Sequence, residues 1–342
     1  MGMEPEPLSF NTPEGDPVTW EVEAEPWHDP FERRLTLVVQ GTRLVQRRVP
    51  RAEGRDREYL YDLLENEARM GARLLTRLRG DYPPELPRLL GYSLDAEEPF
   101  VLLSDRRGEP VTRYYGALLI AEQRGLQVSL FRAVRILSAC GIVHRRIDPS
   151  TVRWDGTTVQ LTDLSHATLA GTRRLRLGEA PYASPAQREG VGVASTSDDL
   201  WSAGMVLYRT ITGRDVADRP DLAATPALQA VHDVFSGAPP TAGEVLARLR
   251  APDPMQSIPV EQDLALEEGR VAFDRAREAR RDPSDATAAT AAPAAPAFDD
   301  RTRVQPAPTG DEPRRTWLTR WLPLAVLLVL LLVLWLLASS SA

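Results

Sequence analysis

The chain has 342 residues, of which 43% are hydrophobic and 26% charged, a composition that supports a substantial globular core. Its formal net charge of −7 argues against nucleic acid as a partner, and we expect none. A single cysteine, Cys140, excludes an intramolecular disulfide and any metal site built from several thiolates. All 41 basic residues are arginine, so no chemistry that requires a lysine amine is available.

The first third of the chain has the pattern of a strand-rich domain. Residues 1–16 are acidic and rich in proline, lack the apolar stretch of a secretory signal, and are predicted to be a disordered tail. Residues 17–107 are predicted to contain one helix over 57–79, where leucines recur at helical spacing. The predicted strands are Val18–Val22, Arg34–Val39 and Arg43–Val45, in which β-branched residues are frequent, and also Leu89–Ser93 and Phe100–Leu103.

The next part of the chain is predicted to be mostly helical. Residues 108–254 carry helical apolar spacing, interrupted by a hairpin from Val152 to Leu161 with its turn at Gly156. Residues 255–281 are a candidate charged helix with few large apolar side chains. Residues 282–316 are rich in alanine, proline, threonine and aspartate and are predicted to be a disordered linker.

The end of the chain is strongly apolar. Trp321–Ala338 contains 18 residues without a charge, which as a helix would span about 27 Å, close to the thickness of a bilayer core. A buried core helix would need a polar face, and this segment has none. We therefore expect a transmembrane helix over residues 317–338 and a short extracytoplasmic tail over 339–342. Arginines precede the helix, which predicts a single-pass cell-membrane protein with its N-terminal domain in the cytoplasm.

Four motifs follow one another over residues 141–204, around and after the predicted hairpin. Gly141–Val152 resembles the protein-kinase catalytic loop, and Val159–Ser165 resembles the D-F-G segment. Pro181–Ala186 resembles the A-P-E segment, and Ser197–Gly204 resembles the D-x-W-S-x-G helix of the same family. In this order and spacing they resemble the protein kinase superfamily, in particular bacterial Ser/Thr protein kinases, over roughly residues 17–250.

The resemblance implies a fold and a domain layout. The expected fold class is α+β, with a bilobal protein-kinase-like fold followed by a flexible linker and one transmembrane helix. Residues 17–107 would form the β-rich N-lobe, and residues 108–254 would form the helical C-lobe.

Several positions depart from the family in ways that bear on activity. Arg146 stands where the family has the aspartate that accepts the substrate proton, and a guanidinium cannot accept one. Thr151 matches the Mg²⁺-binding asparagine and is a poorer ligand, while Arg47 matches the phosphate-pairing lysine. Trp27–Glu32 replaces the glycine-rich loop without a glycine. We therefore expect no intact catalytic site, with degenerate positions at Arg47, Arg146 and Thr151.

Three family positions are retained, Asp163, Glu67 and Asp199. Asp163 matches the metal-binding aspartate and would hold metal–nucleotide if any binds; otherwise it caps a turn. Glu67 matches the glutamate of the N-lobe helix and would then pair with Arg47 as a remnant that holds the fold. Asp199 matches the aspartate that braces the catalytic loop. Asp148 is a candidate displaced base, provided that the loop backbone rotates. The histidines show no metal-ligand spacing, and we expect no metal site.

The favoured hypothesis is a membrane-anchored pseudokinase that acts as a cytoplasmic protein-interaction or signalling scaffold. It would bind a protein partner at the membrane and the lipid bilayer through Trp321–Ala338, and it would need no cofactor. The alternative is a membrane-anchored Ser/Thr kinase with a rearranged active site that uses ATP and Mg²⁺. A third possibility is a kinase-like module of a secretion or envelope assembly, which rests on layout alone. Arg173, Arg174 and Arg176 would bind an acidic partner or phosphate, or simply face solvent.

Overall fold

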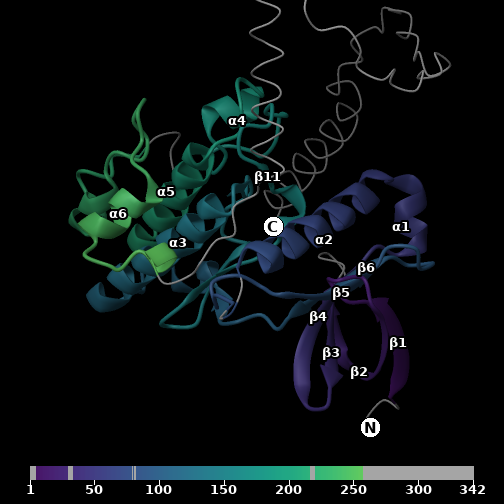
Figure 1. Ribbon diagram of the computed structural model, residues 1–342. Coiled ribbons are helices and arrows are strands. Elements are labelled where there is room, and N and C mark those ends of the chain that lie inside the picture. The colour runs from purple at the N-terminus through teal and green to yellow at the C-terminus, as the bar shows by residue number, and fades with distance from the viewer. Residues whose placement is uncertain (1–4, 30–33, 79, 81, 216–219, 257–342) are drawn as a thin grey trace, which may run out of the picture. The chain divides into compact units, whose positions relative to one another are not determined.

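The computed structural model describes residues 5–29, 34–78, 80, 82–215 and 220–256 (Figure 1). The first part is a β-barrel with the strand order β1-β2-β3-β4-β6-β5, in which neighbouring strands are antiparallel. The strands are β1 (Glu6–Asn11), β2 (Pro17–Asp29), β3 (Arg34–Val39), β4 (Thr42–Arg48), β5 (Leu89–Ser93) and β6 (Phe100–Ser104). The five strands predicted over residues 17–107 are all present.

Strand β1 corrects the prediction that residues 1–16 are a disordered tail. Glu6–Asn11 pairs along its whole length with β2, and Asn11 also pairs with Tyr92 of β5, which closes the barrel. The physical reason is the burial of Phe10, which is only 4% exposed and packs edge-on against Trp20 with ring centroids 4.7 Å apart. Leu8, on the same side of the strand, also packs against this core.

Two helices follow β4, the short α1 (Arg51–Asp56) and the long α2 (Tyr59–Arg77), which matches the helix predicted over 57–79. Leucines on one side of α2 pack with side chains of the barrel strands in a shared core. Gly71 lets the helix approach β5 closely, since a Cβ atom there would lie 2.8 Å from Cβ of Leu89.

The second part is built around α3 (Ile120–Ala139), whose Leu126, Leu130 and Phe131 are fully buried. The predicted hairpin is confirmed as β9 (Val152–Trp154) and β10 (Val159–Leu161). The other helical elements are η1 (Val111–Tyr114), η2 (Leu164–His166), α4 (Pro185–Glu189), α5 (Thr196–Thr212), η3 (Pro226–Val231), α6 (Ala242–Arg248) and η4 (Pro254–Gln256). Three short strands complete it: β7 (Glu109–Pro110), β8 (Ile142–Val143) and β11 (Thr168–Leu169).

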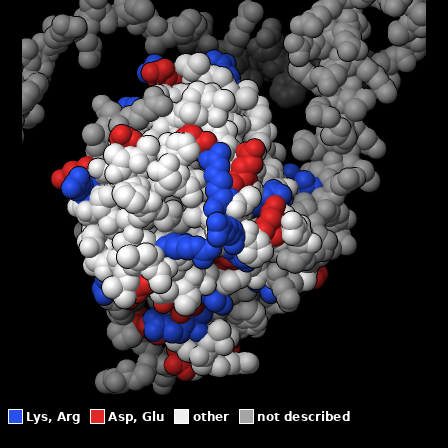
Figure 2. Space-filling model, turned by 90° about the vertical axis from the view of Figure 1, so that its left-hand side faces the viewer, with Lys and Arg blue, Asp and Glu red and all other residues white. Residues whose placement is uncertain are grey.

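Figure 2 looks onto the side of the molecule at the left of Figure 1, where α6 is labelled. Uncharged residues cover most of the described surface in this view, and arginine side chains lie beside acidic ones. Among the residues that the structure describes, no helix is long and apolar enough to cross a membrane. The predicted linker over 282–316, the transmembrane helix over 317–338 and nearly all of the predicted charged helix lie outside the described residues.

Candidate functional site

The candidate site lies where the barrel part meets the helical part, and Arg47 is at its centre. Arg47 sits near the end of β4, Glu67 lies on the buried side of α2, and Asp163 precedes η2. One guanidinium nitrogen of Arg47, Nη1, donates to Oε2 of Glu67 at 2.5 Å and to Oδ1 of Asp163 at 2.7 Å. The three side chains are 15%, 1% and 9% exposed, so a single buried cation joins three elements that are far apart in sequence.

The charges of this group determine its protonation. Burial on its own lowers the pKa of Arg47, but the carboxylates of Glu67 and Asp163 outweigh that effect and raise the pKa above its ordinary value. Arg47 therefore stays charged. The predicted pairing of Glu67 with Arg47 is confirmed by this geometry.

Arg146 approaches the same carboxylate from the other side. Its Nη1 lies 3.3 Å from Oδ2 of Asp163, and its Nε lies 3.6 Å from Oδ2 of Asp148. Each carboxylate oxygen of Asp163 thus faces a guanidinium group.

Asp163 also has a conformational role of its own. Its backbone is left-handed, with φ of 70°, and its Oδ1 accepts hydrogen bonds from the backbone N–H of Ser165 at 3.3 Å and from the Ser165 hydroxyl at 2.6 Å. This is the turn-capping role that was one of the two interpretations of Asp163. Asn66, which the sequence analysis did not single out, donates from Nδ2 to the carbonyls of Ser165 at 2.9 Å and Ala167 at 2.8 Å. It ties α2 to η2 beside the arginine pair.

Thr151, at the position of the metal-binding asparagine, is turned into its own loop. Its buried hydroxyl donates to the carbonyl of Arg146 at 2.8 Å and accepts from the backbone N–H of Asp148 at 3.0 Å. These bonds commit the hydroxyl of Thr151 to the structure of the loop.

The residues present do not fit the Mg²⁺–nucleotide group that a kinase-like cleft would hold. Both oxygens of Asp163 pair with arginines, which repel a divalent cation, and Thr151 is committed to the loop. Within the described ranges, no group of three or more His, Cys, Asp or Glu side chains could hold a metal ion. Residues 30–33, in the place of the glycine-rich loop, lie outside the described part of the chain.

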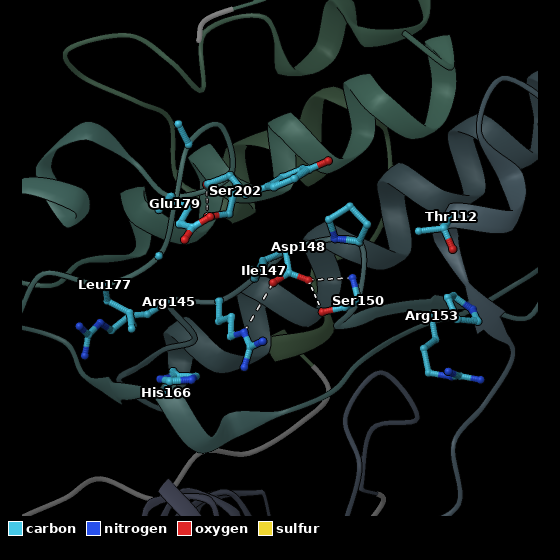
Figure 3. A pocket seen from close by; sticks show the side chains of 17 residues that line it. Thr112, Arg145, Ile147, Asp148, Ser150, Arg153, His166, Leu177, Glu179 and Ser202 are labelled. Atoms are coloured by element: carbon cyan, nitrogen blue, oxygen red, sulfur yellow. Dashed lines mark hydrogen bonds and ion pairs between the residues drawn. The ribbon is translucent and has the colours of Figure 1, made fainter. Parts of the chain in front are cut away.

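Asp148, the candidate displaced base, lines a cavity of 760 Å³ (Figure 3). In this view it lies near the centre, with Arg145 and His166 on one side and Arg153 on the other. Its Oδ1 accepts from the backbone N–H of Ser150 at 2.7 Å and from the Ser150 hydroxyl at 2.5 Å. One carboxylate oxygen is therefore committed to the loop backbone, while the other faces Arg146.

The loop that carries Arg146 is braced from beneath by Asp199. Its two oxygens accept from the backbone N–H groups of His144 at 2.7 Å and Arg145 at 2.9 Å, as its family position predicts. Burial raises the pKa of Asp199 to about 7, against the opposing effect of the two N–H donors. Burial also lowers the pKa of His144 to about 4, so this fully buried ring is neutral and its Nε2 lies 3.0 Å from the carbonyl oxygen of Thr162.

The three arginines of the segment after β11 do not share one role. Arg174 forms a two-point ion pair with Asp198, with Nε 3.0 Å from Oδ2 and Nη2 3.1 Å from Oδ1. Asp198 is 1% exposed and also accepts from the Ser184 hydroxyl at 2.7 Å. The expectation that Arg174 faces solvent or an acidic partner is therefore wrong, whereas Arg173 and Arg176 are exposed.

Comparison with known proteins finds kinases. Testis-specific serine/threonine-protein kinase 3 of Mus musculus is 30% identical over 98 residues, which cover 27% of this chain and 37% of that protein. Probable serine/threonine-protein kinase PknB of Bifidobacterium longum is 30% identical over 133 residues, 35% of this chain and 19% of that protein. The matched part is therefore well under half of each relative. No protein-family model matches the chain.

Among solved structures, the kinase PK-1 of Cydia pomonella granulovirus superposes with a TM-score of 0.47 at 15% identity, over 64% of this chain and 90% of that one. The sequence relatives, together with the four ordered motifs, show that this chain is similar to protein kinases over the matched part.

Proposed function

We propose that this chain is a pseudokinase, a protein-interaction or signalling scaffold that transfers no phosphate. The observation that carries the proposal is the pairing of Asp163 with Arg47 at 2.7 Å and with Arg146 at 3.3 Å. Two covalently attached cations stand where a kinase would bring a metal ion to this carboxylate. Arg146 also stands at the position of the general base, and a guanidinium, which stays protonated in proteins, cannot take a proton from a hydroxyl.

We further propose that the scaffold is held at the cytoplasmic face of the cell membrane by the helix expected over residues 317–338. The support is the uncharged run Trp321–Ala338 and the arginines that precede it. The partner would be a protein at that membrane, and neither nucleotide nor metal would be required for binding it.

The test is made on the full chain in detergent micelles, in two assays. With radiolabelled ATP and Mg²⁺ or Mn²⁺, neither autophosphorylation nor transfer to a generic peptide substrate should exceed the blank. In thermal unfolding, 1 mM ATP should raise the melting temperature by less than about 2 °C, because a ligand at or below its dissociation constant adds at most about 0.4 kcal/mol. A shift of several degrees that requires the divalent ion would overturn the proposal.

One observation favours the alternative of an active Ser/Thr kinase with a rearranged site. Asp148 lines the 760 Å³ cavity beside the lost base position, and a rotation of its loop would release Oδ1 from Ser150. If phosphotransfer is found, Asp148→Asn should abolish it. Asp155→Asn is the matched control, because Asp155 caps the turn at Thr157 and Thr158 in the same way and does not line this cavity.

A further inference from the structure

The segment between β11 and α5 contains one antiparallel β-bridge, and we call the two short stretches that it joins the ribbon. The backbone N–H of Arg174 donates to the carbonyl of Gly192 at 3.0 Å, and the N–H of Ala194 donates to the carbonyl of Thr172 at 2.8 Å. Between these bonds, Arg173 lies directly opposite Val193. The two halves of this segment, about twenty residues apart in sequence, therefore form one local unit.

Four exposed side chains gather on this ribbon. Arg173 opposes Val193, and a Cβ atom at Gly190 would lie 3.6 Å from the carbonyl carbon of Leu175, which brings Leu175 beside the residues next to Val191. We call the exposed surface formed by Arg173, Leu175, Val191 and Val193 the ribbon face. Its three aliphatic members are 68%, 59% and 52% exposed for Leu175, Val191 and Val193. They are half of the large hydrophobic residues that the described part of the chain exposes.

The ribbon is held rigidly from its inner side. Arg174 points inward to the buried Asp198, with contacts of 3.0 and 3.1 Å, and Ala194 is 1% exposed. Arg145 donates from Nη2 to the carbonyl of Leu175 at 3.2 Å. A preformed apolar face loses little conformational entropy when something covers it, so it is suited to docking.

The end of the described chain lies close to this face. Asp253 and Ser195 line one cavity of 720 Å³, and Ser195 is two residues beyond Val193. The chain continues from Gln256, and the eight residues from 257 to 264 extend at most about 26 to 29 Å. The segment that follows Gln256 is therefore within reach of the ribbon face.

The composition of that segment complements the ribbon face. Glu261–Glu268 contains four carboxylates together with Leu264 and Leu266. The ribbon offers aliphatic side chains and Arg173, whose side chain has no hydrogen-bond or ion-pair partner among the described residues, with the exposed Arg176 close by. Apolar groups would meet apolar groups, and carboxylates would meet guanidiniums.

We propose that Glu261–Glu268 of the same chain docks on the ribbon face and covers Leu175, Val191 and Val193. A short tether gives an effective concentration on the order of millimolar, so even a weak contact would be occupied for much of the time. A protein partner that uses the ribbon face must then displace this segment. The inference does not depend on whether the chain transfers phosphate.

The experiment is chemical crosslinking of the full chain in detergent micelles with a short bismaleimide. Val193→Cys and Leu264→Cys form the test pair, and Leu119→Cys with Leu264→Cys forms the control pair. Leu119 is a control because it is also exposed, at 70%, but lies just before the first residue of α3. Ser138, near the last residue of α3, lines the 720 Å³ cavity, and the length of the helix separates Leu119 from Ser138 by about 28 Å. The native Cys140 is fully buried and burial raises the pKa of its thiol to about 11, so it does not react.

The expected result is an intrachain crosslink that forms at least about fivefold faster in the test pair than in the control pair. Replacing Arg173 by Glu in the test pair should slow it by roughly two- to fivefold, as loss of an exposed ion pair would. Equal rates in the two pairs would overturn the proposal. So would a crosslink that joins two chains, which would make a second copy the occupant. The readout needs no nucleotide, so a failed pseudokinase test leaves this result unaffected.

Discussion

Substitution of Arg47 by Met removes the cation at the centre of the candidate site while keeping most of the side chain's volume. The Glu67 side chain, which is 1% exposed, loses its ion pair with Arg47 at 2.5 Å. The Asp163 side chain, which is 9% exposed, loses its ion pair with Arg47 at 2.7 Å. Loss of one partner of a buried ion pair destabilises a protein by about 3 to 5 kcal/mol. Because Asp163 keeps Arg146 at 3.3 Å, we expect the lower end, about 3 kcal/mol.

The measurement is thermal unfolding of the full chain and its variants in detergent micelles, followed by circular dichroism. For a domain of this size, about 3 kcal/mol lowers the melting temperature by roughly 6 to 12 °C. Arg48→Met is the matched control on the same strand, since Arg48 pairs with Glu98 through side chains that are 42% and 40% exposed. An exposed pair contributes under about 1 kcal/mol, so this variant should melt within a few degrees of the parent.

A second variant isolates the charge effect from packing. In Arg47→Met/Glu67→Gln, the buried carboxylate that lost its partner is neutral, so the double variant should be more stable than Arg47→Met alone. The argument fails if Arg47→Met melts no lower than Arg48→Met. It also fails if adding Glu67→Gln lowers the melting temperature further.

Three further outcomes are expected. Folding lowers the pKa of His144 from its ordinary 6.5 to about 4, so the contribution of this residue to stability falls as pH falls from 6.5 toward 4, whereas Asp199, whose pKa folding raises to about 7, contributes in the opposite direction over the same range. Relative to the parent chain, His144→Gln should therefore gain about 2 kcal/mol of stability between pH 6.5 and pH 4.5, measured by urea unfolding. Gly71→Ala should lower the free energy of unfolding by about 1 to 3 kcal/mol in the same assay, because the new Cβ atom would lie 2.8 Å from Cβ of Leu89. An unchanged free energy of unfolding would contradict the close packing of α2 on β5. Truncation after Arg315 should release a soluble, folded domain. In membrane vesicles whose cytoplasmic side faces the protease, the protease should cut the full chain within residues 282–316. Protection of the domain from the protease would contradict the proposed topology.

Much of the fold was predictable because its elements carry strong local signals. The strands of residues 17–49 are rich in β-branched residues, and α2 has leucines at helical spacing. Strand β1 was missed because the segment around it is acidic and rich in proline, and its order depends on pairing with β2 and on the burial of Phe10 in a barrel that no local pattern reveals. Closure of the barrel is a tertiary effect.

The candidate site was predicted only in part, because some of its contacts depend on tertiary structure. The pairing of Glu67 with Arg47 followed from two family positions, and the structure contains it. For Arg146, the sequence predicted only that the catalytic base is missing, and not that its guanidinium pairs with Asp163. Its approach to Asp163 depends on left-handed backbone at Arg145, with φ of 66°, and at Asp163, with φ of 70°, which sequence spacing does not predict for residues other than glycine. Asn66 was missed because an amide on a helix gives no sign of the carbonyls that it will bind.

The substitutions at positions 47 and 146 have a joint consequence that neither has alone. A kinase-like cleft takes its cation from solution, so its geometry responds to the concentrations of metal and nucleotide. Here two guanidiniums are attached to the chain, one on β4 and one on the loop after β8, and both contact the carboxylate of Asp163. Such a cation cannot dissociate, so the junction of α2, β4 and η2 should keep one arrangement whatever the nucleotide level. A scaffold that has to present the same surface continuously to a partner gains from that arrangement, whereas a catalyst that must bind and release nucleotide in every cycle does not.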